Sequence, residues 1–422
     1  MRYPSFPIED QLIFRLCSKP VDPETIAGIV GQDRIDWDAF LGTIRRHKVA
    51  APVLASLLGI PRLQSRLQFL QERARLEVRA VLHDNRVFRA ELSRMVRRLK
   101  ENNLDCVLLK GLSLDFSGLR YMGDIDLMVR QEDLIQAVDT ILRIDGYAYR
   151  PADRDGASSK SILGHPLPRC EKRRILRQIP WNNEFQLIHG SRGVMVELHH
   201  RPFQPRNPQG HFSEIPMPVL EASPMFWARR RYSEELECAI PAPEHSLILM
   251  CLKNAVKHSP ANGTFRLSVL TDIDHLVRGG VSWDRLQTDS EQLEAAPFVV
   301  FSLRQAKTLL GTPVPASVLH NLTALSTPGQ IRAGRLHMRS LTSLRSTSVV
   351  YSKLYQSLRP SVYGGSLAQR LYWGSFLPFF LPTRRRIGGF FGLPQQSPLI
   401  PLVYAVNPLR WVYKVMKDRL RS

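Results

Sequence analysis

The sequence predicts an α+β fold in which a small mixed β-sheet is flanked by helical regions on both sides along the chain. Two observations carry this prediction. Short apolar runs of strand length are concentrated between residues 106 and 198, with turns and one helical pattern between them. The segments before and after this part show apolar residues at helical spacing. We therefore expect a helical region over residues 1–102, a core that contains the sheet over 103–215, a helical domain over 216–320 and a basic, aromatic helical tail over 321–422.

Composition indicates a globular protein. The chain has 422 residues, enough to bury a sizeable core, of which 44% are hydrophobic and 23% are charged. No apolar run follows a basic start, so we expect no signal peptide. The most apolar C-terminal stretches, 376–381 and 399–406, are too short and too interrupted by proline to span a bilayer. The five cysteines are widely spaced and lack a CxxC pair, which favours a reducing cytoplasm over a disulfide framework or structural zinc.

The formal net charge of +20 is the most informative bulk property. It predicts attraction to polyanions, among them RNA, DNA, nucleotides and an anionic membrane surface. A basic surface that only maintains solubility explains the charge equally well, because net charge describes association and not the chemistry of a site.

The N-terminal region is predicted to be helical after a short entry, punctuated by proline, over residues 1–34. The Asp-Trp-Asp sequence at 36–38 opens an amphipathic helix, because carboxylates stabilise a helix N-terminus. A second apolar helix is expected over 49–58, and a long one over 64–102. The many arginines of the long helix favour a solvated face over a nucleic-acid groove.

The most informative stretch lies between two apolar runs, 107–109 and 125–129. A loop that starts with Lys110-Gly111 joins them, and Asp124 and Asp126 stand at the beginning of the second run. In a β-strand alternate side chains point to the same face, so both carboxylates are expected to project together. Adjacent like charges require a counter-charge, and Mg²⁺ binds through one or two carboxylates together with substrate phosphates. The alternative, which a bare Asp-x-Asp pattern favours, is an edge strand with an exposed acidic face.

Between residues 133 and 180 the pattern changes from regular to irregular. We expect a helix over 133–144 and a strand over 147–149, followed by a polar, irregular segment over 151–180. A basic cluster at 169–177 lies in that segment. It fits a mobile flap over an active site, an RNA contact or a solvated loop insertion.

Two further strands form a predicted hairpin. The apolar runs 184–188 and 194–198 flank a Ser-Arg-Gly turn. On the second strand Glu197 shares a face with His199, so Glu197 is a strand carboxylate of the same form as the earlier pair. His199 and the adjacent His200 are candidate metal ligands, although a hydrogen bond to a metal ligand is the more usual role for such a histidine.

These residues resemble the pattern of the nucleotidyltransferase superfamily, in which Gly and then Gly or Ser follow a strand and an acidic pair begins the next one. Leu-Lys-Gly at 109–111, Leu-Arg at 119–120 and Asp-Ile-Asp-Leu at 124–127 are similar to the family of uncharacterised nucleotidyltransferases. Val-Glu-Leu-His at 196–199 resembles the strand that carries the third carboxylate of that superfamily. One position departs from the pattern, because Leu112 stands where Gly or Ser is usual. Leu112 weakens the expectation that a side chain at this position binds the triphosphate, which backbone N–H groups could bind instead.

The resemblance extends over residues 30–320. Helices are expected over 243–258 and 266–277 and from residue 282, and their openings are similar to those of the family's helical half. Residues 202–218 have the Pro, Gly and Asn content of a linker.

The tail over 321–422 mixes basic and aromatic residues, as in 384–393 and 411–419. This mixture fits an anionic membrane surface, nucleic acid or an ordinary helical cap on the domain.

The resemblance implies a role for each candidate site residue. Asp124, Asp126 and Glu197 would be the catalytic residues and would hold Mg²⁺ or Mn²⁺, with Glu197 nearest the acceptor hydroxyl. A second set would surround the triphosphate of an NTP: Lys110, Gly111, Ser113 and Arg120. For Arg120, an ion pair with a protein carboxylate is an equal expectation.

The implied activity is the transfer of a nucleoside monophosphate from an NTP to a hydroxyl acceptor, with release of pyrophosphate, by a cytoplasmic protein. The net charge slightly favours an RNA end as acceptor, and a small molecule or a protein or peptide stays open. The alternative is a catalytically inactive module of the same fold that binds nucleic acid or an anionic membrane surface. Phosphoryl transfer of the kinase type ranks last, because the chain lacks a P-loop and an HRD-like segment.

Overall fold

The structure, a computed structural model, describes residues 6–32, 34–114, 118–151, 165–179, 182–203, 218, 221–258, 265–341, 343–345, 398–399 and 401–403. The chain forms two compact units: residues 1–258 with 266–326, and residues 259–265 with 327–422. The second unit contains helix α15 (Pro328–Ser340), which begins at a capping box. The domain boundaries expected at residues 102, 215 and 320 stay predictions.

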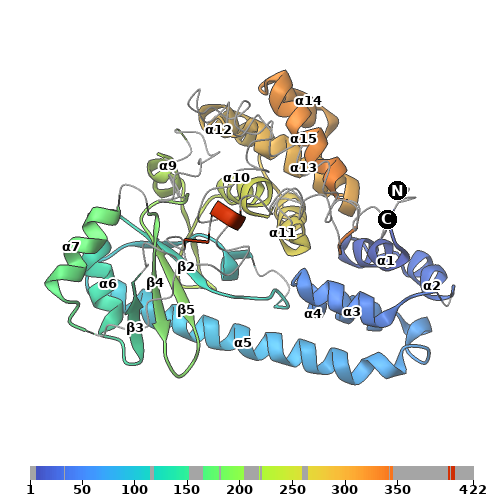
Figure 1. The fold of residues 1–422 in the computed structure, drawn as a ribbon, viewed down its shortest axis with the longest axis horizontal. Coiled ribbons are helices and arrows are strands. Elements are labelled where there is room, and N and C mark those ends of the chain that lie inside the picture. Colours follow the sequence, from blue (N-terminus) through green and yellow to red (C-terminus); the bar gives the residue numbers. More distant parts are fainter. Residues whose placement is uncertain are drawn as a thin grey trace. The chain divides into compact units, whose positions relative to one another are not determined.

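A seven-stranded mixed sheet lies in the first unit (Figure 1). Its strands in chain order are β1 (Cys106–Leu108), β2 (Ile125–Val129), β3 (Tyr147–Arg150), β4 (Glu184–His189), β5 (Met195–His199), β6 (Arg231–Ser233) and β7 (Cys238–Ile240). Their order in the sheet is β3-β4-β5-β2-β1-β7-β6, so β2 is central, parallel to β5 and antiparallel to β1. The predicted α+β fold and the β4–β5 hairpin are confirmed. The alternative that β2 is an exposed edge strand is wrong.

One face of the sheet packs against helices and forms the core. The helices that contribute to this core are α5 (Gln68–Glu101), α6 (Leu134–Leu142) and α7 (Arg169–Gln178). The residues of β2 and β5 in the same cluster are Ile125, Leu127, Val129, Val196 and Leu198. Because side chains alternate along a strand, Asp126 and Glu197 point to the opposite face of the sheet.

Helix α7 corrects the expectation of an irregular segment over 151–180. Its Ile175 is fully buried, and Lys172 forms an ion pair with Asp139 of α6. A single buried apolar residue among many charged ones gives a short apolar stripe, which explains why the helix was not predicted. Residues 152–164 lie outside the described part of the chain.

The N-terminal helices are α1 (Ile8–Cys17), α2 (Pro23–Val30), α3 (Trp37–Arg46) and α4 (Ala50–Leu58), followed by the 3₁₀ turn η1 (Pro61–Leu63). The first two lie in the entry over 1–34, punctuated by proline, for which no individual helix was predicted. In α1 the buried face includes Glu9 and Asp10, so the apolar pattern is broken. Asp36 caps α3 as predicted, since its carboxylate accepts a hydrogen bond of 2.9 Å from the Ala39 N–H.

The C-terminal helices of the first unit are α9 (Ser223–Ala228), α10 (Pro243–Leu252), the π-helical turn η3 (Lys253–Lys257), α11 (Leu267–Arg278), α12 (Trp283–Gln292), α13 (Ala296–Leu310) and α14 (Ala316–Ala324). These elements confirm the helices expected over 243–258 and 266–277 and from 282. Figure 1 shows α10 and α11 across the sheet from α5. The hairpin β6–β7, which adds to the sheet through β1, was not predicted.

Within the described residues no helix is both long and apolar enough to cross a membrane. The linker expected over 202–218 falls largely outside the described residues, and so do the basic, aromatic stretches 384–393 and 411–419 of the tail.

Candidate active site

Two buried carboxylates lie side by side at the centre of the sheet. Asp126 of β2 and Glu197 of β5 are paired in the register of two neighbouring parallel strands, so their side chains leave the sheet on the same face. Asp126 is 0% exposed and Glu197 is 6% exposed. Repulsion between two carboxylates is strong where water is excluded, so this position requires positive charge.

Lys110 supplies part of that charge. It follows β1, its Nζ forms an ion pair with Asp126 Oδ1, and it lies 3.9 Å from Glu197 Oε2. Burial disfavours the charged amine, but the carboxylates of Asp126, Asp124 and Glu197 outweigh this effect and raise the pKa of Lys110. Lys110 is therefore a cation at neutral pH, and it balances one of the carboxylates.

His199 supports Asp126 from the end of β5. Its Nε2 lies 3.1 Å from Asp126 Oδ1, and its Nδ1 accepts a hydrogen bond of 3.2 Å from the side-chain amide of Asn183. With Nδ1 as the acceptor, the proton of the neutral ring is on Nε2, which donates to Asp126. Burial would raise the pKa of Asp126, but Lys110 and His199 hold it well below its usual range. Asp126 is thus an anion in a fixed orientation.

Glu197 is held differently. Burial, together with the charges of Glu184 and Asp126, raises the pKa of Glu197 to about 7. Its Oε1 accepts a hydrogen bond of 3.4 Å from the side-chain amide of Gln186. At neutral pH the carboxyl group is balanced between its acid and base forms, which suits a group that exchanges a proton with a neighbouring hydroxyl.

The donor atoms at this position fit a divalent cation. Asp126 Oδ2 and Glu197 Oε2 are buried and have no hydrogen-bond partner among the described residues. Ligand atoms of Asp126, Glu197 and His199 all lie within 4.8 Å of one another. Carboxylate oxygens are the donors that Mg²⁺ and Mn²⁺ prefer. Because His199 Nε2 donates to Asp126, His199 is placed to orient that carboxylate.

Asp124 lies outside this group of three. It is half-buried and immediately precedes β2, and its charge acts on Lys110 and on Lys48. Because the strand begins at Ile125, pairing with β5 does not hold Asp124 beside Asp126 as strand alternation had predicted. Its place as a metal ligand stays a prediction.

The turn after β1 brings the backbone close to Asp124. Gly111 opens the 3₁₀ turn η2 (Gly111–Leu114) with a φ of +75°, a left-handed conformation that favours glycine. A Cβ at Gly111 would lie 3.5 Å from the carbonyl oxygen of Asp124. Leu112, the departure from the family pattern, is buried in the core. The buried Ser113 hydroxyl has no hydrogen-bond partner in the described part of the chain. The turn thus uses Leu112 for packing and leaves Ser113 uncommitted.

Arg120 binds a protein carboxylate. Its Nε and Nη2 donate to the two oxygens of Asp272 in α11 at 2.8 and 2.9 Å. This bidentate pair is one of the two roles expected for Arg120, and it ties the loop before β2 to α11. Contact between Arg120 and a phosphate stays a prediction.

Further cations, which no sequence motif marks, surround this side of the site. They are Lys48, Lys253, Lys257 and Arg266. Burial and the neighbouring charge of Arg266 lower the pKa of Lys48. Burial and the charge of Lys110 lower the pKa of Lys253 to about 8. These side chains come from segments far apart in the sequence, so only the fold brings them together, and the cluster is one that an anion would stabilise.

Comparison with curated proteins and with solved structures finds no match. A family profile described as uncharacterised nucleotidyltransferase matches residues 33–311, more than half of the chain. The matched range contains the whole candidate site, from Lys48 to Asp272, and it ends just after α13. The resemblance seen in the motifs is therefore confirmed. The chain belongs to the family of uncharacterised nucleotidyltransferases.

Proposed function

We propose that the protein transfers a nucleoside monophosphate from an NTP to a hydroxyl acceptor and releases pyrophosphate. One observation carries the proposal: Asp126 and Glu197 are buried side by side, each with one oxygen free of hydrogen bonds to the described residues. Membership of the nucleotidyltransferase family supports an NTP as the substrate.

Mg²⁺ or Mn²⁺ is the proposed cofactor, and Asp126 and Glu197 would hold it with Asp124 as a further ligand. When bound, a divalent cation stabilises the entering and leaving oxygens of an in-line displacement at phosphorus. Lys110, which pairs with Asp126, would exchange this carboxylate for a phosphate oxygen of the substrate.

Glu197 would remove the proton of the acceptor hydroxyl, since its pKa of about 7 suits a general base at neutral pH. As the acceptor oxygen bonds to the α-phosphorus, the bond from that phosphorus to the bridging oxygen breaks and pyrophosphate leaves. The groups proposed to hold the triphosphate are the backbone at Gly111, the Ser113 hydroxyl, Lys48, Lys253, Lys257 and Arg266. Both the net charge of +20 and the cations of the site fit a polyanionic acceptor, which slightly favours an RNA end over a small molecule or a peptide.

The test is incubation of the purified protein with each NTP, labelled at the α-phosphate, with Mg²⁺ or Mn²⁺ and with bacterial RNA and protein as acceptors. The wild type is compared with Asp126→Asn and Glu197→Gln, and with Asp284→Asn, which removes an exposed carboxylate of α12. We expect the first two variants to lose about 10²-fold or more of the label transfer, as general-base substitutions do, and the control to keep it. Equal transfer by all four proteins would refute the assignment.

A second candidate function is supported by the ion pair between Lys110 and Asp126, in which a protein cation lies against the proposed metal ligand. It is a catalytically inactive module that binds nucleic acid or an anionic membrane surface. This candidate predicts NTP binding that does not depend on a metal, and no label transfer. Calorimetry of NTP binding with and without Mn²⁺ separates the two functions.

A further inference from the structure

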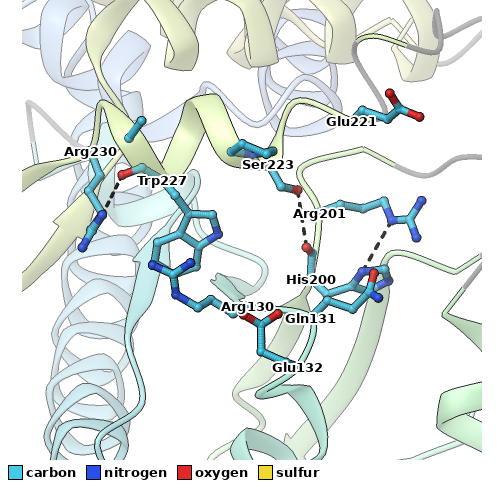
Figure 2. Close-up of a pocket in the computed structure, with 11 residues that line it drawn as sticks. Arg130, Gln131, Glu132, His200, Arg201, Glu221, Ser223, Trp227 and Arg230 are labelled. Atoms are coloured by element: carbon cyan, nitrogen blue, oxygen red, sulfur yellow. Dashed lines mark hydrogen bonds between the residues drawn. The ribbon is translucent and has the colours of Figure 1, made fainter.

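A polar pocket lies at the C-terminal ends of β2 and β5, the two strands that carry the carboxylates. Figure 2 shows it between α9 and the residues that follow β2 and β5. Its volume is about 600 Å³, in the range of sites that take small molecules. We name it the arginine pocket and define it by six of its lining residues: Arg130, His200, Arg201, Ser223, Trp227 and Arg230. Arg130 follows Asp126 by four residues, about 13 Å along a strand, so the pocket is separate from the carboxylate pair.

The exposed Arg130 places its guanidinium over an aromatic ring. Its guanidinium carbon lies 4.8 Å from the centroid of the buried Trp227 ring. Figure 2 shows the two side chains together. Arg230 lies 5.3 Å from the same centroid and donates to the Trp227 carbonyl at 2.7 Å. The N–H groups of a guanidinium lie in its own plane, so contact with a ring face leaves them able to bind a planar or tetrahedral oxyanion. Among the described residues no carboxylate forms an ion pair with Arg130.

Arg201 is a partly desolvated cation without a carboxylate partner in the described part of the chain. Its Nη2 donates to the Ile179 carbonyl at 2.9 Å, and its Nε donates to His200 Nδ1 at 3.4 Å. His200 Nε2 donates in turn to the Asn182 carbonyl at 2.7 Å, which leaves Nδ1 as the acceptor for Arg201. Burial lowers the pKa of Arg201, and no neighbouring carboxylate opposes this effect.

The contrast between Arg201 and other half-buried arginines is informative. Arg120 binds Asp272, Arg229 binds both oxygens of Asp289 at 2.7 Å, and each of these pairs balances its charge. The acidic residues that line the arginine pocket, Glu132 and Glu221, are exposed and form no ion pair with Arg130 or Arg201, whereas Arg230 forms an ion pair of 3.6 Å with Asp105. The partly desolvated charge of Arg201 is unfavourable unless an opposite charge approaches it, and the exposed Arg130 adds a second cation beside the same pocket.

We propose that the arginine pocket binds the phosphate group of a small phosphorylated molecule, at a site distinct from Asp126 and Glu197. Arg130 and Arg201 bind the phosphate oxygens through charge-assisted hydrogen bonds. The side chain of Gln131 also lines the pocket, and so does the Ser223 hydroxyl, which donates a hydrogen bond of 3.5 Å to the His200 carbonyl and can accept one from the remainder of the ligand. Free phosphate and a phosphate ester share this chemistry, and the experiment separates them.

The experiment is calorimetry of the full chain without divalent metal, with inorganic phosphate, glycerol phosphate and a nucleoside monophosphate as probes and glycerol as the uncharged control. We expect Arg130→Gln and Arg201→Gln each to weaken phosphate binding by about tenfold, the usual effect of one lost charge-assisted hydrogen bond. Arg97→Gln, which removes one charge from an exposed position of α5, should leave the affinity unchanged. Thermal unfolding of each variant shows whether it is folded.

Two double variants show whether phosphate binds in the arginine pocket or at the carboxylate site. Asp126→Asn/Glu197→Gln should keep the affinity for phosphate, and so should Lys48→Gln/Lys257→Gln, which removes cations of the carboxylate site. Tighter binding of an ester than of inorganic phosphate would identify an organophosphate as the ligand, and equal binding would identify free phosphate. Loss of binding in the Lys48 variant with full binding in the Arg130 and Arg201 variants would overturn the proposal. Binding of RNA or anionic vesicles but of none of the small phosphates would also overturn it. None of these measurements depends on nucleotidyl transfer.

Discussion

Glu197 couples the stability of the protein to pH. In the folded chain its pKa is raised to about 7 from an ordinary value of 4.5, first by burial and then by Glu184 and Asp126. Between these two values the folded state holds a proton that the unfolded state releases, so the free energy of unfolding falls as the pH rises through this window. The contribution of this one residue is on the order of 3 kcal/mol.

We therefore expect Glu197→Gln, whose side chain stays neutral, to gain stability relative to the wild type as the pH is raised from about 5 to about 7.5. The measurement is urea unfolding of both proteins across this range without divalent metal. Glu291→Gln, an exposed change in α12, serves as the control and should run parallel to the wild type. A constant difference between wild type and Glu197→Gln would mean that the carboxyl group is not held in its acid form.

Single residues of the site were predicted where the strand pattern itself carried the information. Asp126 and Glu197 follow from an acidic residue between apolar neighbours, and alternation alone turns both away from the core. The ion pair of Lys110 with Asp126 was not predicted, because it depends on how the turn after β1 folds back on β2. The supporting role of His199 was anticipated as the more usual one, but the partner Asn183 became visible only with β4 and β5 in place.

At the scale of elements, the pair of Arg120 and Asp272 joins the loop before β2 to α11. Both side chains are largely buried, with 17% and 4% of their side-chain surface exposed, so removal of one leaves the other unpaired. We expect Asp272→Asn to lower the free energy of unfolding by about 3 kcal/mol and Arg120→Gln by a similar amount. The double variant should cost clearly less than the sum, by about 1–3 kcal/mol.

The measurement for this pair is chemical unfolding of the two single variants and the double variant. A matched control is the ion pair of Arg98 with Glu101 on the exposed face of α5, where both side chains are close to half exposed. Its removal should change stability by about 0.5 kcal/mol or less. Additive losses for Arg120 and Asp272 would contradict the view that the pair acts as one clamp between the two elements.

Helices and strands were easier to predict when they were long and when their apolar and polar residues alternated regularly. Helix α5 spans 34 residues with a regular buried stripe and was predicted with small errors at its ends. Strands β6 and β7 have three residues each, too few to show alternation, and β7 is recruited by pairing with β1. Helix α1 was missed because a proline-rich start and two buried acids obscure its apolar face.

At the scale of the whole molecule, the sequence predicted the fold class but not the arrangement of the sheet. The order of the strands depends on pairings between segments far apart in the chain, such as β2 with β5, for which no local pattern exists. The central place of β2 follows from that order. Carboxylates are ordinary on an edge strand, where water solvates them. In the centre of this sheet they are buried, and Asp126 and Glu197 each keep one oxygen without a hydrogen-bond partner among the described residues, so a cation is favoured there.

The net charge of +20 leads to a prediction about the acceptor. If the acceptor is RNA, each contacted phosphate adds about −0.7 to the slope of log affinity against log salt, so three contacts reduce affinity roughly twentyfold between about 50 and 200 mM salt. We expect label transfer at limiting RNA and saturating NTP to follow this slope. An uncharged acceptor would give nearly constant transfer over the same range.

We expect helix α7 to supply phosphate contacts that produce this salt dependence. Its Arg173 and Arg177 are exposed and lie one turn apart on a basic helix, which packs on the core face of the sheet. Arg173→Gln/Arg177→Gln should make the slope shallower by about 1.4 if both residues contact phosphates, while Arg97→Gln/Arg285→Gln removes the same charge elsewhere and should not. If both double variants make the salt slope shallower by the same amount, RNA is attracted by the net charge of the protein alone. A slope that neither changes would place the RNA on another surface, and the basic residues of α7 would then be a solvated face.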